Sequence, residues 1–259
     1  MKYILISFIS HSFIIYIKFS KSIIKNTFNE VINGVVDFDK WNIGLIPTGS
    51  GNDFASNIGL NPKDPIANLK KILEGEAKKT DYIKVNNETI CINVIGTGID
   101  VNVLENFEKH TKMKGSFRYF YSLLEALLHV KWYKFDLQID DGTWQKKEGF
   151  ITCVCNGSSI GGGIPICPGA KVDDNQLEFV FVNKVKKITI LHYLIKLMSG
   201  KILKAKVTEH LYCKKVIFQN DEEFVMQIDG NIGYKEKKYI CELVKDGIKI
   251  GRASCRERV

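Results

Sequence analysis

The chain has 259 residues, of which 45% are hydrophobic and 25% charged, as in a globular protein with one large domain or two modest ones. Its net charge of +8 suits an anionic partner, but no aromatic and basic motif of a nucleic-acid-binding module is present, so we expect no nucleic acid partner. The seven cysteines lack metal-ligand spacing and the histidines are dispersed, which argues against a structural zinc site. The odd number of cysteines, without a signal cleavage pattern, favours the reducing cytosol.

The first 22 residues contain two apolar runs, 3–9 and 13–17, which His11 and Ser12 separate. Together the runs approach the length of a membrane helix, but their β-branched and aromatic residues are also typical of a core strand. No small-residue cleavage site follows, as a secretory signal would require. We expect that this segment is not a membrane anchor.

A strand–turn–helix pattern begins with the apolar run 43–46, which is short enough for one buried strand. A proline ends the strand, and the missing Cβ atoms of Gly49 and Gly51 let the next residues turn tightly near a ligand. Asn52 or Asp53 can cap the helix that should follow. Free N–H groups at such a junction can bind an anion, and an ordinary βα turn is the alternative.

Helical spacing predicts a helix over 65–78, after which strands dominate to about residue 229. Asn86 and Asn87 form a hairpin turn between two of these strands, and a polar turn separates the strands 215–219 and 224–228. The other expected elements are strands over 79–85, 90–95, 135–139 and 149–155, helices over 117–131 and 188–198, apolar runs at 239–244 and 248–250, and an unstructured tail over 252–259.

The helix over 188–198 has an apolar stripe that we interpret as ordinary core packing. The stripe consists of Ile188, Leu191, Ile195 and Met198, with Leu194 beside it. Six lysines lie around this helix: Lys184, Lys186, Lys187, Lys201, Lys204 and Lys206. They suit an anionic partner such as ATP or a membrane surface, or they keep the protein in solution.

Residues 47–55, Pro-Thr-Gly-Ser-Gly-Asn-Asp-Phe-Ala, closely resemble the second nucleotide-site motif of the diacylglycerol kinase catalytic family, which includes bacterial lipid kinases and sphingosine kinase relatives. Residues 27–34, Thr-Phe-Asn-Glu-Val-Ile-Asn-Gly, resemble the helix after its first motif, and 96–100 resemble a strand-end loop that faces its cleft. By spacing alone 156–163 is a flexible glycine-rich loop, but with 168–174 it resembles the family's second-domain block. The resemblance extends from about Thr27 to about Gly251.

The resemblance implies an α/β fold with two parts. An NAD kinase-like nucleotide domain, incomplete at its start, covers 23–80, and residues 237–251 could complete it. A β-rich, β-sandwich-like domain for the lipid substrate covers 81–236. Residues 1–22 are a segment foreign to the family, and 252–259 form the tail.

The resemblance also implies the site residues. The positions that match nucleotide contacts are Thr27, Gly49, Ser50, Gly51 and Asn52. Asp53 and Asp81 match a water-bridged magnesium network near the phosphates. A structural magnesium site is matched by the backbone of Lys171 and Gln176 and the side chain of Asp174, an oxygen-only set that suits a hard cation. A helix cap is the alternative role for Asp53, and a solvated turn is the alternative for Asp174.

Two departures from the family bear on activity. Its first motif, Gly-Gly-Asp-Gly-Thr, reads Ile23-Ile24-Lys25-Asn26-Thr27 here, which favours a truncated or frame-shifted start, with diverged function as the alternative. Its Asp-Gly-Glu motif reads Asp229-Gly230-Asn231, so Asn231 replaces the glutamate that is the family's proposed base. An amide does not take up protons near neutral pH, which leaves Asp229 as the candidate base.

We therefore expect ATP-dependent phosphorylation of a lipid hydroxyl, such as that of diacylglycerol, with ATP and Mg²⁺ as cofactors. The protein would meet its lipid at the membrane surface as a peripheral cytoplasmic protein, with a homodimer as one expected assembly. The alternatives are a catalytically impaired lipid- or nucleotide-binding remnant and an NAD kinase-like enzyme. Since two acidic groups are missing, we predict slow or no turnover, and little gain from Asn231→Glu alone.

Overall fold

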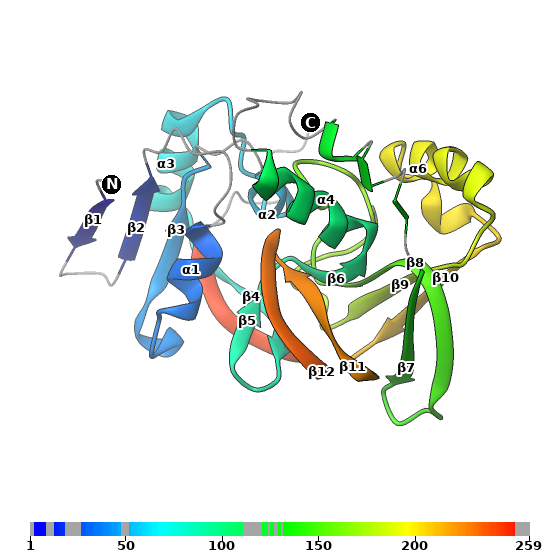
Figure 1. The fold of residues 1–259 in the computed structure, drawn as a ribbon. Helices are drawn as coiled ribbons and strands as arrows, with labels where there is room; N and C mark the ends of the chain where they lie inside the picture. The colour runs from blue at the N-terminus through cyan, green and yellow to red at the C-terminus, as the bar shows by residue number, and fades with distance from the viewer. Residues whose placement is uncertain are drawn as a thin grey trace.

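The structure is a computed structural model that describes residues 3–8, 13–18, 27–47, 52–110, 121–123, 125–126, 129–130 and 132–251. Within these residues, twelve strands join one sheet with the order β1-β2-β3-β12-β11-β6-β8-β9-β10, while β4 pairs with β12 and β5, and β7 pairs with β11 and β8 (Figure 1). The strands are β1 (Tyr3–Phe8), β2 (Phe13–Lys18), β3 (Asn42–Leu45), β4 (Ala77–Val85), β5 (Thr89–Cys91), β6 (Val94–Gly98), β7 (Tyr133–Ile139), β8 (Gln145–Cys155), β9 (Leu177–Asn183), β10 (Thr208–Cys213), β11 (Lys215–Ile228) and β12 (Asn231–Gly251). The helices are α1 (Thr27–Asn33), α2 (Asp53–Asn57), α3 (Pro65–Glu74), α4 (Ile99–Lys109) and α6 (Ile190–Met198), with short 3₁₀ turns η1 (Phe38–Lys40), η2 (Lys187–Thr189) and η3 (Ile202–Lys204).

The N-terminal part is an α/β layer built on parallel strands. β3 pairs in parallel with β2 on one side and with the end of β12 on the other. One core cluster joins Phe28 of α1 to Ile43 of β3 and Ile250 of β12. Segments from opposite ends of the sequence therefore pack together, with β3 as their common neighbour (Figure 1).

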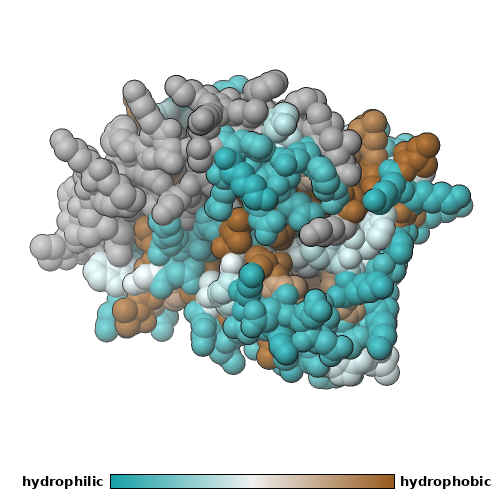
Figure 2. All heavy atoms as spheres, viewed as in Figure 1, coloured by the Kyte–Doolittle hydropathy of each residue, from teal (hydrophilic) through white to brown (hydrophobic). Residues whose placement is uncertain are grey.

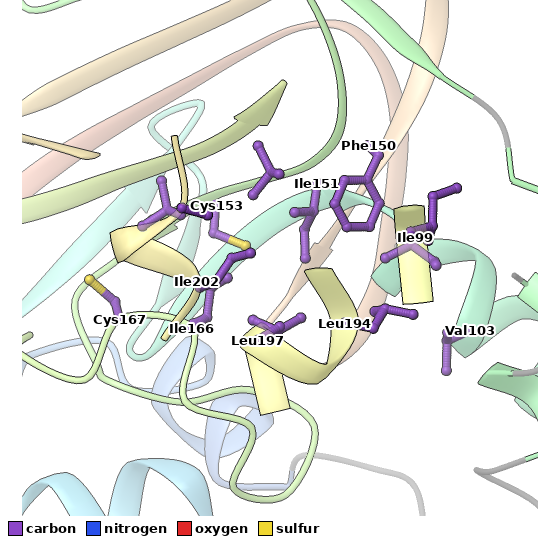
Figure 3. Close-up of a cluster of buried hydrophobic side chains, with 14 of the residues drawn as sticks. Ile99, Val103, Phe150, Ile151, Cys153, Ile166, Cys167, Leu194, Leu197 and Ile202 are labelled. Carbon is purple, nitrogen blue, oxygen red and sulfur yellow. The ribbon is translucent and has the colours of Figure 1, made fainter. Parts of the chain in front are cut away.

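The second part is β-sandwich-like, because β11 and β8 are connected through both β6 and β7. Its inner core is aromatic, and ring centroids lie 5.4 to 6.3 Å apart among Phe135, Phe179, Phe181 and Phe218. A second core lies under α4 and α6, where Ile99 and Leu194 pack with Phe150 of β8 (Figure 3). The α/β fold with a β-sandwich-like second part is thus confirmed.

Several strand boundaries differ from the sequence-based expectation. The strand predicted over 90–95 divides into β5 and β6, because backbone N–H groups between them bind a carboxylate. The turn predicted between 215–219 and 224–228 is extended backbone within β11, although the register changes there. Both C-terminal apolar runs belong to the single strand β12. The predicted loop 96–100 is the end of β6 and the start of α4.

The hairpin turn is confirmed: Asn86 and Asn87 have φ angles of 50° and 60°, and they connect β4 to β5. Residues 1–22 contribute the antiparallel pair β1 and β2. None of the helices in the described part of the chain has the length and apolar character needed to cross a membrane. The helix predicted over 117–131 falls partly outside the described residues, as does the whole tail 252–259.

Helix α6 contradicts the interpretation of its apolar stripe. The side chains of Ile188, Leu191, Ile195 and Met198 are 89%, 62%, 60% and 60% exposed, whereas the residues that pack into the core are Ile190, Leu194 and Leu197. The stripe interpreted as core packing is therefore the solvent side. Apolar residues lie on nearly every side of this helix, so spacing did not distinguish the two faces.

Candidate functional site

Two glycine-rich segments that are far apart in the sequence meet at Asp53, the first residue of α2. Its carboxylate accepts hydrogen bonds from Gly163 N at 2.6 Å, Gly162 N at 2.9 Å and Ser159 Oγ at 3.1 Å. Gly162 and Gly163 have φ angles of 86° and 110°, which glycine adopts readily and other residues rarely do. The segment expected to be a flexible loop is thus held against α2. Asn52 occupies the N-cap position without a side-chain cap hydrogen bond.

Asparagine side chains continue this contact into the sheet. Asn57 of α2 donates to Asn93 Oδ1 at 3.0 Å and accepts from Ser158 Oγ at 2.6 Å, while Asn93 Nδ2 donates to Ser159 O at 2.8 Å. A Cβ atom at Gly157 would overlap the amides of both asparagines, so this position accommodates only glycine. Asn57 and Asn93 were not among the site residues that the sequence predicted. The available signal was Asn93 itself, a polar residue inside an apolar run, because a buried amide needs partners.

Asp229, in the turn directly after β11, is the most heavily hydrogen-bonded carboxylate of the site. Its Oδ2 accepts from Asn29 Nδ2 at 2.6 Å and Ile92 N at 2.8 Å; its Oδ1 accepts from Asn93 N at 2.8 Å, Val94 N at 3.1 Å and Cys91 Sγ at 3.2 Å. Asn29 belongs to α1, so this carboxylate joins the α/β part to the β-sandwich-like part.

These contacts bear on the candidate base. Burial raises the pKa of Asp229, and the donors from Ile92, Cys91, Asn93 and Asn29 oppose that shift. Because five donors occupy the two oxygens, the carboxylate has little capacity left to accept a proton from a substrate. The partly buried Asn231 begins β12 opposite Ile228, directly after this turn.

Asp81 and Asp174 lie near one another in a second acidic cluster. Asp81 is buried and accepts from Asn175 N and Asp246 N, both at 2.8 Å. Burial makes the largest contribution to the raised pKa of Asp174, and the negative charges of Asp81, Glu178 and Asp173 raise this pKa further. Asp81 and Asp53, which were expected to belong to one magnesium network, therefore have different hydrogen-bond partners. The carboxylate near Asp81 is that of Asp174, the expected metal ligand.

This second cluster fits a hard cation. Asp174 Oδ1 accepts from Gln176 N at 3.1 Å, so the residues expected to hold Mg²⁺ form one compact turn before β9, with Lys171 at its start. The Oδ1 atom of Asn175 is buried without a hydrogen-bond partner. A buried amide oxygen without a hydrogen-bond partner, in the same turn as a carboxylate with negatively charged neighbours, offers the oxygen donors that Mg²⁺ or Ca²⁺ prefers.

The expected phosphate contacts lie mainly outside the described residues. This holds for Gly49, Ser50 and Gly51, and for the side chain of Thr27. The helix that follows, α2, has only five residues. A dipole from so short a helix contributes little to anion binding.

One cluster brings a cysteine and a histidine together, although their positions in the sequence gave no sign of it. Cys167 Sγ donates to Glu178 Oε2 at 2.8 Å, and His210 Nε2 contacts the same oxygen at 2.5 Å. The three ligand-type atoms lie within 4.8 Å of one another. The 2.8 Å and 2.5 Å contacts to Glu178 are hydrogen-bond distances, so the three side chains satisfy one another.

Two family models match the chain. The diacylglycerol kinase catalytic domain matches residues 27–85, and the YegS C-terminal NAD kinase beta sandwich-like domain matches residues 93–235. Their boundary falls between β4 and β6, where the hydrogen bonds to Asp229 interrupt the sheet.

Similar proteins bear related names. A protein named putative lipid kinase from Staphylococcus aureus (strain MSSA476) is 29% identical over 229 residues, which are 86% of this chain and 73% of that protein. A putative lipid kinase from Staphylococcus epidermidis is 30% identical over 80% of this chain and 67% of its own length. In fold, the chain resembles a crystal structure of a putative diacylglycerol kinase from Bacillus anthracis, with a TM-score of 0.66, 22% identity, and coverage of 87% of this chain and 74% of that one.

Proposed function

Since this chain belongs to the diacylglycerol kinase catalytic family, we propose that its site serves ATP-dependent transfer of a phosphoryl group to a lipid hydroxyl such as that of diacylglycerol. The observation that carries this proposal is the convergence of both family segments on one site. Asp53 binds Gly162 and Gly163, and Asn29 binds Asp229. Each contact joins a residue of the catalytic segment to one of the β-sandwich-like segment.

The residues of this chain would have different roles in the reaction: some hold the site in place, and others contact the substrate. When bound, Mg²⁺-ATP would supply the phosphoryl group that the lipid oxygen attacks. Asp229 fixes the turn that carries Asn231, because it ties that turn to the backbone of β6 and to α1. Asn231 can orient a hydroxyl group by hydrogen bonding, but it cannot remove the proton of that group. We therefore propose that turnover by this chain is slow.

A second candidate, a lipid- or nucleotide-binding protein without turnover, is favoured by the same observation at Asn231. Both can be tested with radiolabelled ATP and diacylglycerol in mixed micelles. We expect little product from the unaltered chain. A variant that combines Asn231→Glu with Ile23→Gly, Ile24→Gly, Lys25→Asp and Asn26→Gly should be faster by roughly 10² or more, because general-base catalysis typically contributes that much.

The matched control replaces Asn231→Glu by Asn231→Gln in the combined variant, and its rate should stay near the starting value. Rapid turnover by the unaltered chain would contradict the slow-turnover proposal and identify Asp229 as the working base. A combined variant that binds ATP but transfers nothing would support the non-catalytic candidate. Phosphorylation of NAD in place of lipid would show an NAD kinase-like enzyme.

A further inference from the structure

Helix α6 presents an apolar surface to solvent that the core does not use. We call Ile188, Leu191, Ile195 and Met198 the outer stripe; each side chain is at least 60% exposed. Leu191, Ile195 and Met198 lie along one line of α6 because they are spaced by four and three residues, and Ile188 precedes the helix in the 3₁₀ turn η2. In the space-filling view, hydrophobic atoms gather over α6 at the upper right, with hydrophilic residues around them (Figure 2).

The opposite face holds the helix in place. Ile190, Leu194 and Leu197 are 3%, 4% and 4% exposed and belong to the core under α6. Figure 3 shows Leu194 and Leu197 directed into this core, toward the side chains of α4 and β8. The exposure of the outer stripe is therefore a property of a well-packed helix, and a surface of this kind marks an interaction site.

The charge around the outer stripe has one sign. From Lys184 to Val207 the chain has seven lysines and no acidic residue. Lys184 pairs with Glu148 at 3.0 Å. The exposed lysines that form no ion pair within the described part of the chain are Lys186, Lys187, Lys201, Lys204 and Lys206. They lie before and after the helix, so positive charge flanks the apolar line at both ends.

We infer that the outer stripe and its flanking lysines dock on an anionic lipid bilayer. An apolar helical line can enter the boundary between headgroups and acyl chains, while lysines at its ends reach anionic headgroups. A second copy of the chain fits worse, because a two-fold contact would bring two groups of lysines together. The inference rests on the proposed function for its purpose, since docking would bring the site to a lipid substrate.

Docking can be measured on the whole chain without nucleotide. Sedimentation with sucrose-loaded vesicles would compare phosphatidylcholine alone with phosphatidylcholine that contains phosphatidylglycerol. The apolar variant is Leu191→Ser with Ile195→Ser, and its matched control is Ile66→Ser with Leu73→Ser on α3, where both side chains are also exposed. The charge variant changes Lys201, Lys204 and Lys206 to glutamine; its control changes Lys235, Lys237 and Lys238, which are exposed on β12.

We expect the unaltered chain to prefer anionic vesicles. The apolar variant should lose about tenfold or more in partitioning, and the charge variant should lose about tenfold or more on anionic vesicles only. Each control should stay within about twofold of the unaltered chain. Equal losses in the variants and their controls would overturn the inference. So would equal binding to both vesicle types, or an apolar variant that changes the oligomeric state instead of the partitioning.

A separate assay distinguishes this inference from the proposed function. A short-chain, water-soluble diacylglycerol does not require docking, so the combined variant with glutamate at 231 should phosphorylate it with or without the outer stripe. Loss of vesicle binding with retained turnover would support docking by α6. Normal vesicle binding without any turnover would reject the enzyme proposal alone.

Discussion

Asp229 and Asp100 are both buried carboxyl groups, yet their surroundings differ. Five donors surround Asp229. Both oxygens of Asp100, in the first turn of α4, are buried without a hydrogen-bond partner. Burial raises the pKa of Asp100 to about 7, and weaker interactions with the backbone of Val101 and the side chain of Gln227 oppose this only in part.

The difference shows that burial alone does not determine what a carboxyl group does. Asp229 organises the backbone of residues 91–94 and receives Asn29 from α1. Asp100 organises no comparable contact, so its charge costs stability when it ionises. Asp229 is a structural link, whereas Asp100 lacks the hydrogen bonds that would offset the cost of its charge.

The largest expected effect comes from removing the link. Asp229→Ala should lower the free energy of unfolding by roughly 5 kcal/mol, about 1 kcal/mol for each donor that loses its acceptor. Urea denaturation at pH 7 measures it. Asn29→Ala, which removes one donor, should cost about 1 kcal/mol. A loss below about 1 kcal/mol for Asp229→Ala would show that these donors find water or other acceptors.

Asp100→Asn should have the next largest effect, and only above acidic pH. The pKa of Asp100 in the folded state is about 7 against a usual 3.8, so the folded state binds the proton more tightly. The free energy of unfolding therefore falls as pH rises from about 4 to 7, and the penalty is complete above pH 7. At most it reaches about 4 kcal/mol, since each pKa unit corresponds to about 1.4 kcal/mol.

The asparagine variant cannot ionise and should lack this pH dependence. Urea denaturation at pH 4.5, 6 and 8 should show that the free energy of unfolding of the variant increases relative to that of the unaltered chain as pH rises. Asp141→Asn on the surface serves as the control. If the difference between Asp100→Asn and the unaltered chain does not change with pH, Asp100 is hydrated and the contrast with Asp229 disappears.

Asp174 has fewer hydrogen-bond donors than Asp229 and more than Asp100, and its substitution should have the smallest effect on stability. It is partly buried beside other carboxylates, and a bound cation would offset that repulsion. In millimolar Mg²⁺, Asp174→Ala should lower stability by about 1–2 kcal/mol through lost binding. In chelator the same change should be neutral or slightly stabilising, because it removes repulsion. Melting temperatures in both conditions test this, with Asp173→Ala as the control, and equal losses would rule out the site.

Local pattern was enough for several features of this protein. The two asparagines at 86 and 87 predicted the hairpin turn, and the glycines around 49–51 and 161–163 identified the segments on which the family resemblance rests. The helix predicted over 65–78 begins at Pro65 as expected, where Asp64 caps α3 through Ala67 N at 2.9 Å, but α3 ends at Glu74, before Gly75. Each of these features depends on residues within one turn of each other.

Contacts over long sequence separations decided the rest. Asn29 and Asp229 are 200 positions apart, and no local pattern indicated that this aspartate would receive five donors and divide the strand predicted over 90–95. The outward face of α6 was decided in the same way, because both of its faces are apolar and only the position of α4 and β8 selects the one that is buried. Sequence alone thus determined the family, the hairpin turn at Asn86 and Asn87 and the residue types of the site. The tertiary structure decided which carboxylate is satisfied and which apolar surface is exposed, because hydrogen-bond partners and burial depend on neighbours in space.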